Sequence, residues 1–277
     1  MVVNDVGGSM HGDGADPSVA DQVVEEIARA GGVAVASHHS VEGAEGGEAI
    51  VRTAIDRFGR LDAVVSNAGI FHTRPFEELT PDDWRRMLGV HLDGAFHLSQ
   101  PAYRAMKSQG YGRFVFIVSS AGVFGQPSSA HYAAAKAGTL GLANVIAIEG
   151  AEHGILANCV LPFGYSRMVF ETVGDRDQVE VEPGFLHAIE PELVVPMVVY
   201  LASRACELTH HNFSACAGRF ARVFVGLGDG WVAEPDSCPS ADDIAEHLDR
   251  VAAAEPYTIP TSIFDEVFRV CDQLGIG

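Results

Sequence analysis

Tyr132 and Lys136 form the pattern in this sequence that points most directly to chemistry. Residues four positions apart share one face of a helix. A tyrosine is a poor base near neutral pH because its reference pKa is about 10. A cation one turn away stabilises the phenolate and lowers that pKa, so the pair could exchange a proton with an alcohol while hydride leaves the carbon. The same spacing occurs by chance in many long helices, so the neighbouring motifs must decide whether Tyr132 and Lys136 are a catalytic pair.

Two further motifs follow apolar runs that we predict to be strands. Ser119 ends one run and could donate a hydrogen bond to a developing alkoxide, with Ser120 as its rival. Asn67-Ala68-Gly69 follows another run, and its small residues let the backbone approach a flat ligand. Open α/β sheets bind ligands at the carboxyl ends of their strands. The alternative interpretations are strand-end capping for the serines and an ordinary turn for the tripeptide.

The elements that must position these residues alternate between strand and helix along the chain. We predict strands at residues 2–6, 33–37, 61–66, 113–119, 155–160 and 222–225. We predict helices from residue 18 to the glycines at 31–32 and at residues 48–58, 80–108, 130–152 and 191–203. This alternation indicates the α/β class, with right-handed crossovers in a Rossmann-like, doubly wound parallel sheet.

The expected domain organisation is one large domain followed by a tail. Residues 1–237 form the Rossmann-type domain, within which the acidic stretch 171–190 is expected to be a loop or lid. Residues 238–277 form a C-terminal helical extension, with amphipathic helices at 242–254 and 262–274.

Composition narrows the classes of partner. The chain has 277 residues, 47% of them hydrophobic, as in a globular protein. Its net charge of −19 disfavours nucleic acid and anionic lipid surfaces as partners. No apolar run reaches the roughly 18 residues of a membrane span. Five scattered cysteines without a C-x-x-C pair indicate reduced thiols and a cytoplasmic protein, and the twelve histidines lack the spacing of metal ligands, so no metal is expected.

Together with Asn158 and Pro162, these motifs occur in the order typical of short-chain dehydrogenases, and the chain resembles that family up to about residue 230. The resemblance implies an enzyme that moves hydride between a nicotinamide cofactor and a secondary alcohol or ketone. It implies that Tyr132 is the acid/base and that Ser119 orients the substrate oxygen. It also implies that Lys136 binds the nicotinamide ribose and tunes Tyr132, so both belong to the cofactor site. A homodimer or homotetramer is expected on the same ground.

Four short segments carry a closer resemblance, to the (3R)-hydroxyacyl-CoA dehydrogenase domains of peroxisomal multifunctional enzymes type 2 and their bacterial relatives. They are residues 3–8, 90–94, 147–150 and 166–168. This resemblance implies a 3-hydroxyacyl-CoA or sterol-derived CoA substrate. Two alternatives remain open: a steroid or polyketide ketoreductase on the same scaffold, and a truncated, catalytically weak relative that acts as an interaction subunit.

The sequence departs from the family pattern on the substrate side. His91 stands where most members carry the asparagine that helps to hold a proton-relay water. A histidine can both donate and accept, so it could serve that relay as a catalytic residue, or it could make a buried structural hydrogen bond. Ser66 replaces a second asparagine before Asn67. Phe163-Gly164 replaces the common Pro-Gly pair, and Pro162 and Gly164 remain the expected contacts to the cofactor amide.

The amino-terminal segment departs most. The first strand, the first helix and the T-G-x-x-x-G-x-G loop of the family are expected to be missing, which corresponds to roughly 30 residues upstream. Residues 8–14 match the glycine spacing, but Asp13 and Asp16 would repel a pyrophosphate, so we favour a decoy over a phosphate loop. Asp5 then ends the second strand, where a carboxylate bonds the adenosine ribose hydroxyls and favours NAD over NADP. His39 replaces the family's adenine-side aspartate.

Overall fold

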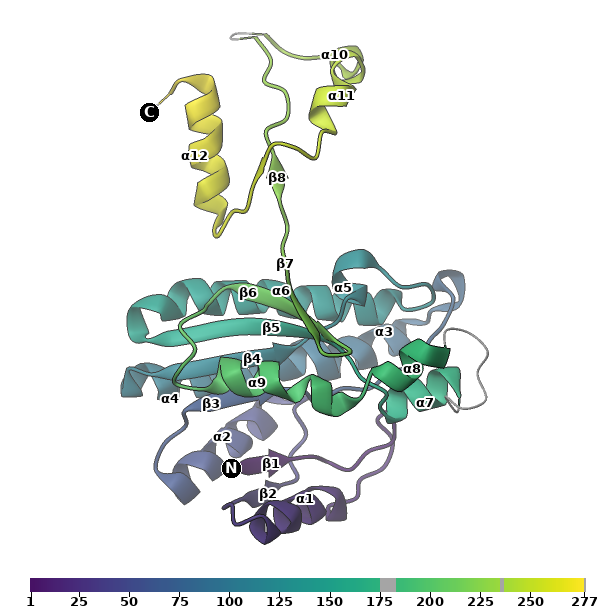
Figure 1. Cartoon of the computed structure of the whole chain (residues 1–277), viewed down its shortest axis with the longest axis vertical. Helices are drawn as coiled ribbons and strands as arrows, with labels where there is room; N and C mark the ends of the chain where they lie inside the picture. The colour runs from purple at the N-terminus through teal and green to yellow at the C-terminus, as the bar shows by residue number, and fades with distance from the viewer. Residues whose placement is uncertain (175–182, 235–236, 277) are drawn as a thin grey trace. The chain divides into compact units, whose positions relative to one another are not determined.

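The computed structural model describes residues 1–174, 183–234 and 237–276 (Figure 1). The chain divides into two compact units, Met1–Arg222 and Val223–Gly277. The tail predicted from residue 238 lies within the second unit. Every candidate site residue lies in the first unit, which is therefore described first.

The strands of the first unit form two separate sheets. One is a parallel pair, β1 (Val2–Asn4) and β2 (Val35–Ser37). The other is a five-stranded sheet in the order β3-β4-β5-β6-β7, in which β3 to β6 pair in parallel. Its strands are β3 (Ala63–Ser66), β4 (Gly112–Ile117), β5 (Ile155–Phe163), β6 (His211–Cys216) and β7 (Arg219–Val223).

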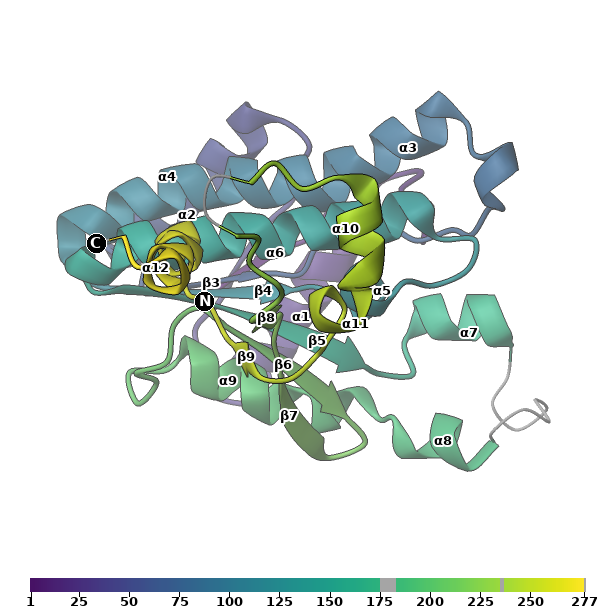
Figure 2. The ribbon, with the colours of Figure 1, turned by 90° about the horizontal axis from the view of Figure 1, so that it is seen from above.

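Helices lie on both faces of the five-stranded sheet, and the predicted doubly wound α/β class is confirmed. Helices α4 (Gly94–Gln109) and α6 (Ala130–Gly150) run side by side on one face, and α9 (Val195–Ala202) packs on the other (Figure 2). The other described helices of this unit are α1 (Ser18–Arg29), α2 (Ala44–Phe58), α3 (Pro81–Leu88), α5 (Ala121–Phe124), α7 (Arg167–Val173) and α8 (Pro183–Ala188).

The single helix predicted over residues 80–108 is interrupted. It begins as expected, because Thr80 and Asp83 form a reciprocal capping box at the start of α3. Residues Gly89–Asp93 then form a π-helical segment before α4 begins. Such segments are rare and are often found at functional sites. This one carries His91, one of the candidate catalytic residues.

Two smaller expectations were wrong, and one was confirmed. Strand β6 was missed because its residues, His-Asn-Phe-Ser-Ala-Cys, are not an apolar run, and the last strand lies at β7 instead of 222–225. Helix α1 begins at residue 18 as predicted, with Pro17 in the cap position, and the Asp16 carboxylate accepts the Ser18 amide at 3.0 Å. Within the loop predicted at 171–190, residues Pro183–Ala188 form α8, and residues 175–182 lie outside the described part.

The core of the first unit is centred on β4, which is buried on both faces as a central parallel strand should be. Phe114 and Phe116 are fully buried, and their rings stack 5.9 Å apart. Arg113 is also buried, but its guanidinium donates to four carbonyl oxygens and so satisfies its hydrogen-bonding groups. A rigid β4 holds the strand end that carries Ser119.

We expect Gly47→Ala to destabilise the protein by about 1–3 kcal/mol, because α2 and α4 pack too closely there for a methyl group. A Cβ on Gly47 would lie 2.2 Å from the carbonyl oxygen of His97, which is backbone and cannot move aside cheaply. The matched control is Gly141→Ala, since a Cβ there meets nothing within 4 Å. In that helix the change should stabilise by about 0.5–1 kcal/mol. Urea unfolding measures the change in the free energy of unfolding for both variants. Equal changes in Gly47→Ala and Gly141→Ala would contradict the packing argument.

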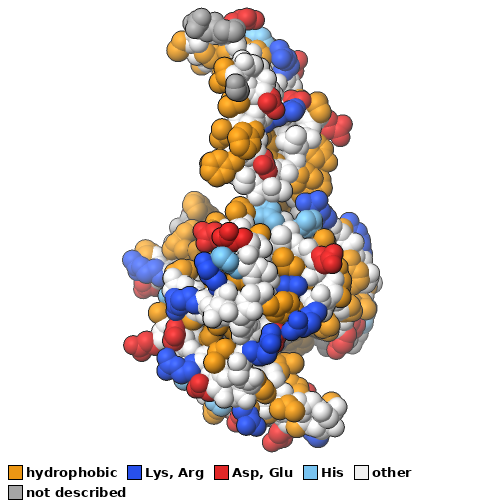
Figure 3. All heavy atoms as spheres, turned by 90° about the vertical axis from the view of Figure 1, so that its left-hand side faces the viewer, with side chains coloured by type: hydrophobic (Ala, Val, Ile, Leu, Met, Phe, Trp, Pro, Cys, Tyr) orange, Lys and Arg blue, Asp and Glu red, His pale blue; other side chains and the backbone are white. Residues whose placement is uncertain are grey.

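The second unit contains short helices and one two-stranded ladder. Its described elements are β8 (Leu227–Gly228), α10 (Ala241–Glu246), α11 (Leu248–Val251), β9 (Tyr257–Thr258) and α12 (Ile263–Leu274), with β8 antiparallel to β9. The helix predicted at 242–254 is thus broken in two, and the one at 262–274 is confirmed with Ser262 in its capping box. Hydrophobic side chains are exposed on this unit, which is the upper part of Figure 3, and they include Ile263, Phe264 and Phe268.

Candidate active site

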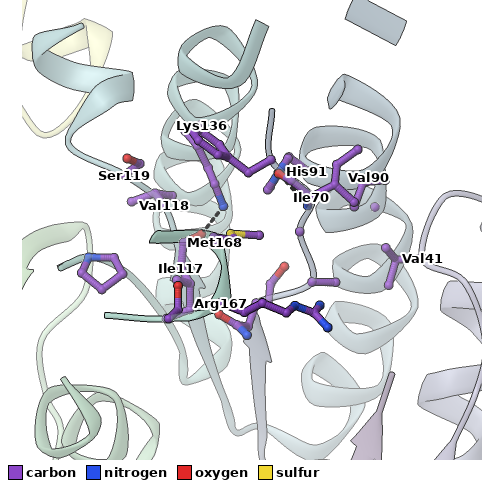
Figure 4. Close-up of a pocket in the computed structure, with 18 of the residues that line it drawn as sticks. Val41, Ile70, Val90, His91, Ile117, Val118, Ser119, Lys136, Arg167 and Met168 are labelled. Carbon is purple, nitrogen blue, oxygen red and sulfur yellow. Dashed lines mark hydrogen bonds between the residues drawn. The ribbon is translucent and has the colours of Figure 1, made fainter. Parts of the chain in front are cut away.

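A cavity of about 1110 Å³ lies where the carboxyl ends of β1, β3, β4 and β5 meet. All the site residues predicted from the sequence line this one cavity, and Figure 4 labels several of them. They are Asp5, Asn67, Ala68, Gly69, His91, Ser119, Tyr132, Lys136, Pro162 and Gly164. Ser120, the rival of Ser119, is not among the lining residues.

Tyr132 enters the cavity from the first turn of α6. Its ring meets Phe71 and His91 edge-on, with centroid distances of 5.0 Å and 5.2 Å. Burial raises the pKa of Tyr132, and a hydrogen bond with the Ser119 side chain opposes that rise. The expectation that Lys136 lowers this pKa is therefore wrong for the present arrangement, because the desolvation of the phenolate outweighs the other contributions. Tyr132 accordingly keeps its proton near neutral pH.

Lys136 is buried one helical turn beyond Tyr132, with 6% of its surface exposed. Its Nζ donates to the carbonyl oxygen of Ile117 at 2.7 Å, drawn as a dashed line in Figure 4. The same nitrogen lies 5.7 Å from the centre of the Tyr132 ring. Burial lowers the pKa of Lys136 to about 8, so the ammonium form still prevails at neutral pH. The structure therefore places an ammonium beside the phenol, at the end of β4.

His91 makes the structural hydrogen bond that was one of its two interpretations. Its Nε2 lies 2.7 Å from the carbonyl oxygen of Ile70 and 3.2 Å from the Ile70 amide nitrogen. A carbonyl can only accept, so the shorter contact favours the tautomer with the proton on Nε2. In the neutral ring Nδ1 then holds a lone pair, and this buried atom has no hydrogen-bond partner within the described residues. His91 also lines the cavity, so a relay role stays a prediction.

We expect His91 to make the protein less stable in acid. Burial lowers its pKa to about 3, with the nearby Lys136 charge as a smaller cause, whereas the unfolded value is about 6.5. Between these values only the unfolded chain binds the proton, so the free energy of unfolding falls as the pH falls through 6.5 toward 3. Between pH 6.5 and 5 this loss is about 2 kcal/mol for one group.

Urea unfolding at pH 5 and pH 7 measures that loss, with His91→Asn as the comparison because asparagine keeps a polar side chain without titrating. The variant should lose about 2 kcal/mol less on acidification than the wild type. His72 and His131, whose pKa values burial also lowers, contribute in the same direction in both proteins and cancel in the difference. An identical acid response of the two proteins would contradict the argument.

The glycine-rich loop after β1 uses several of its amides in internal hydrogen bonds. The Ser9 hydroxyl accepts the amides of His11 and Asp13 at 3.2 Å and 3.1 Å, and the Gly12 amide donates to the Ser9 carbonyl at 2.9 Å. The Asp5 carboxylate accepts the Gly7 amide at 2.6 Å. A phosphate loop needs free amides that point at its ligand. The geometry therefore supports the decoy interpretation of residues 8–14.

The structure adds two facts that the sequence did not predict: Asn158 lies outside the cavity, and hydrophobic side chains line part of it. Asn158 does not line the cavity: its Nδ2 donates to the Leu208 carbonyl and its Oδ1 accepts the His211 amide, so it ties β5 to the start of β6. Hydrophobic side chains from α7, α8 and α9 form a wall of the cavity, and of these only Met168 lies in one of the four short segments singled out in the sequence. They are Met168, Val169, Phe185, Leu186, Val195 and Val198.

Within the described part of the chain, no group of three or more histidine, cysteine, aspartate or glutamate side chains could hold a metal ion. None of the described helices has the length and apolar character needed to cross a bilayer.

Comparison with known proteins places this geometry in context. A family model described as short chain dehydrogenase matches residues 14–175, which is more than half of the chain. Over 284 residues the chain is 44% identical to peroxisomal multifunctional enzyme type 2 of Mus musculus, covering 100% of this chain and 37% of that protein. Over 180 residues it is 38% identical to acetoacetyl-CoA reductase of Rhizobium meliloti, covering 62% of this chain and 73% of that one.

A solved structure agrees with these matches. Full-length peroxisomal multifunctional enzyme type 2 from Drosophila melanogaster superposes with a TM-score of 0.80 at 28% identity, covering 99% of this chain and 49% of that one. The chain thus spans less than half the length of these two multifunctional enzymes.

Proposed function

Because this chain belongs to the short-chain dehydrogenase family, we propose that it transfers hydride between NAD and a secondary alcohol or ketone of the 3-hydroxyacyl-CoA type. The observation that carries the proposal is the convergence of Ser119, Tyr132 and Lys136 on one cavity with an apolar wall. A bound nicotinamide would supply the hydride acceptor or donor.

Each of the three residues has a role that its position supports. Ser119 would donate a hydrogen bond to the substrate oxygen, where negative charge develops. Tyr132 would pass its proton to that oxygen when a ketone is reduced, and would take the proton back when an alcohol is oxidised. Lys136 would hold the cofactor ribose and stabilise the phenolate left on Tyr132, since an ammonium close to an anion favours its charged form.

The residues of the cavity fit a nicotinamide dinucleotide. Asp5 lines the cavity just beyond β1, where its carboxylate would accept hydrogen bonds from ribose hydroxyls and repel a 2′-phosphate, which favours NAD over NADP. At the end of β3, Asn67, Ala68 and Gly69 form a wall of mostly small residues. A Cβ on Gly69 would lie 2.5 Å from the His91 ring, so the small residue is needed there. Pro162 and Gly164 would contact the amide end of the cofactor.

The substrate class rests on the apolar wall and on the relatives. Hydrophobic side chains of α7, α8 and α9 can bury an acyl chain next to Ser119. The Rhizobium meliloti relative is named for acetoacetyl-CoA, a short 3-oxoacyl thioester. A steroid or polyketide ketone on the same scaffold would use the same wall and stays the second candidate.

The test is absorbance at 340 nm with the purified chain, NADH and acetoacetyl-CoA, and with NADPH or a steroid ketone in parallel. We expect turnover with NADH and the thioester, and a KM for NADPH at least about tenfold higher because of Asp5. No turnover with any of these ketones would refute the proposed activity. Turnover with the steroid alone would select the second candidate.

We also propose a reducing compartment and a homo-oligomer. The five cysteines are all free thiols, as expected where disulfides do not persist. Helix α6 exposes Val145 and Ile148, and α4 exposes Phe96, apolar side chains that a second copy could cover. Size-exclusion chromatography with light scattering tests the oligomer, and a monomer at micromolar concentration would contradict it.

A further inference from the structure

We infer that Arg167 binds a diphosphate group in the cavity, as part of the cofactor or of a CoA thioester; this rests on the proposed function. Arg167 begins α7, the helix that follows β5, and it lines the cavity. Figure 4 shows its side chain extending into the cavity on the side away from Ser119, toward Val41. Its Nη2 lies 3.4 Å from the carbonyl oxygen of Gly8, in the loop after β1.

Arg167 differs from the other cations of the cavity in what it contacts. The ammonium of Lys136 donates a hydrogen bond to the carbonyl oxygen of Ile117 and is assigned to act beside Tyr132. The guanidinium of Arg86 forms an ion pair with the carboxylate of Asp13. Within the described residues, Arg167 has no carboxylate partner and only the long contact to Gly8. Its charge is therefore the one best available to an anionic ligand.

Two places in this chain could bind a diphosphate, the glycine-rich loop at residues 8–14 and the start of α1, and the chain itself uses much of both. In the loop, the amides of Ser9, His11, Gly12 and Asp13 bond within the loop. At the start of α1, the carboxylate of Asp16 accepts the Ser18 amide and so places negative charge where a phosphate would sit. Asp5 adds further negative charge beside this loop, in a chain with a net charge of −19. A diphosphate therefore needs a compensating cation in this cavity.

A guanidinium is the side chain best suited to that task. Its planar fork can donate two parallel hydrogen bonds to phosphate oxygens, whereas an ammonium acts as a point charge. Arg167 reaches from the segment after β5 to the loop after β1, and it lines the same cavity as Tyr132 and Asp5. In the cofactor, the diphosphate joins the adenosine half, which Asp5 would hold, to the nicotinamide half, which Lys136 would hold.

The experiment measures ligand binding by calorimetry on the full 277-residue chain, so that it does not depend on turnover. ADP-ribose represents the cofactor diphosphate and CoA the thioester diphosphate, with adenosine and pantetheine as their counterparts without diphosphate. We expect Arg167→Gln to weaken ADP-ribose about tenfold or more and to leave adenosine unchanged. Arg167→Lys should recover part of the loss, and the salt dependence of ADP-ribose binding should become shallower in Arg167→Gln.

The matched control is Arg86→Gln, an arginine of the same cavity that Asp13 already neutralises. It should change ADP-ribose binding by less than about threefold. A loss confined to ADP-ribose assigns the cofactor diphosphate, and a loss confined to CoA assigns the thioester diphosphate; both support the inference. Undiminished binding of both ligands in Arg167→Gln, an equal loss for adenosine and pantetheine, or a wild type that binds neither diphosphate would overturn it. A wild type without turnover whose ADP-ribose binding still depends on Arg167 would refute the activity alone.

Discussion

Replacing Tyr132 by phenylalanine is expected to lower kcat by about 10²- to 10⁴-fold, the range for losing a positioned general acid. Phenylalanine keeps the ring that meets Phe71 and His91 edge-on, so the packing of the cavity should survive. What is lost is the hydroxyl that holds the transferable proton. NADH affinity should stay within about threefold, because the removed group acts on the substrate oxygen.

Tyr103→Phe is the matched control. It removes a hydroxyl that donates to the Glu149 carbonyl at 2.9 Å, between α4 and α6, and Tyr103 does not line the cavity. Steady-state kinetics at 340 nm on both variants measures the difference. If Tyr132→Phe kept more than about a tenth of the wild-type kcat, another group would have to supply the proton, and the assignment of Tyr132 would fail.

Replacing Lys136 by methionine is expected to lower kcat about 100-fold or more without a matching loss of stability. Methionine fills similar space but removes the charge beside Tyr132. Two effects on the fold oppose each other. The variant no longer buries an ammonium, which is costly, but it leaves the Ile117 carbonyl without its donor. These contributions are of similar size, so the free energy of unfolding at pH 7 should change by no more than about 2 kcal/mol.

The same residue predicts a pH dependence with a definite sign. The pKa of Lys136 is about 8 in the fold and 10.5 when unperturbed. Between these values the unfolded chain binds the proton and the folded chain does not, so the free energy of unfolding rises with pH across this window. The rise attributable to this group is at most about 3 kcal/mol. Below pH 8 both states are protonated, and the contribution is constant.

Urea unfolding at pH 8 and pH 10 of the wild type and Lys136→Met isolates this contribution as a difference. Lys107→Met provides the control, because Lys107 is exposed at the end of α4 and should leave both stability and kcat unchanged. If wild type and Lys136→Met showed the same change over this range, the buried ammonium would not be titrating as the structure indicates.

The sequence by itself determined the class of fold and most of the candidate site. Strand β4 was recognisable because a central parallel strand must be apolar on both faces, and Thr80 was recognisable because a capping box is a local pattern. Tyr132 and Lys136 share a face because of helical geometry alone. Ser119 and Asn67 could be placed near them because the ends of parallel strands meet at one edge.

Only the tertiary structure decided the features that depend on burial and on distant partners. The pKa of Tyr132 is set by its desolvation, which no spacing reveals, so the expected lowering became a rise. His91 lies in a π-helical segment and bonds to Ile70, a partner that its sequence neighbours do not specify. The role proposed for Arg167 rests on its contact with the loop after β1 and on the lack of a carboxylate partner among the described residues, and both depend on the fold. Such properties belong to the assembled environment, because desolvation and charge depend on everything within a few ångströms in space.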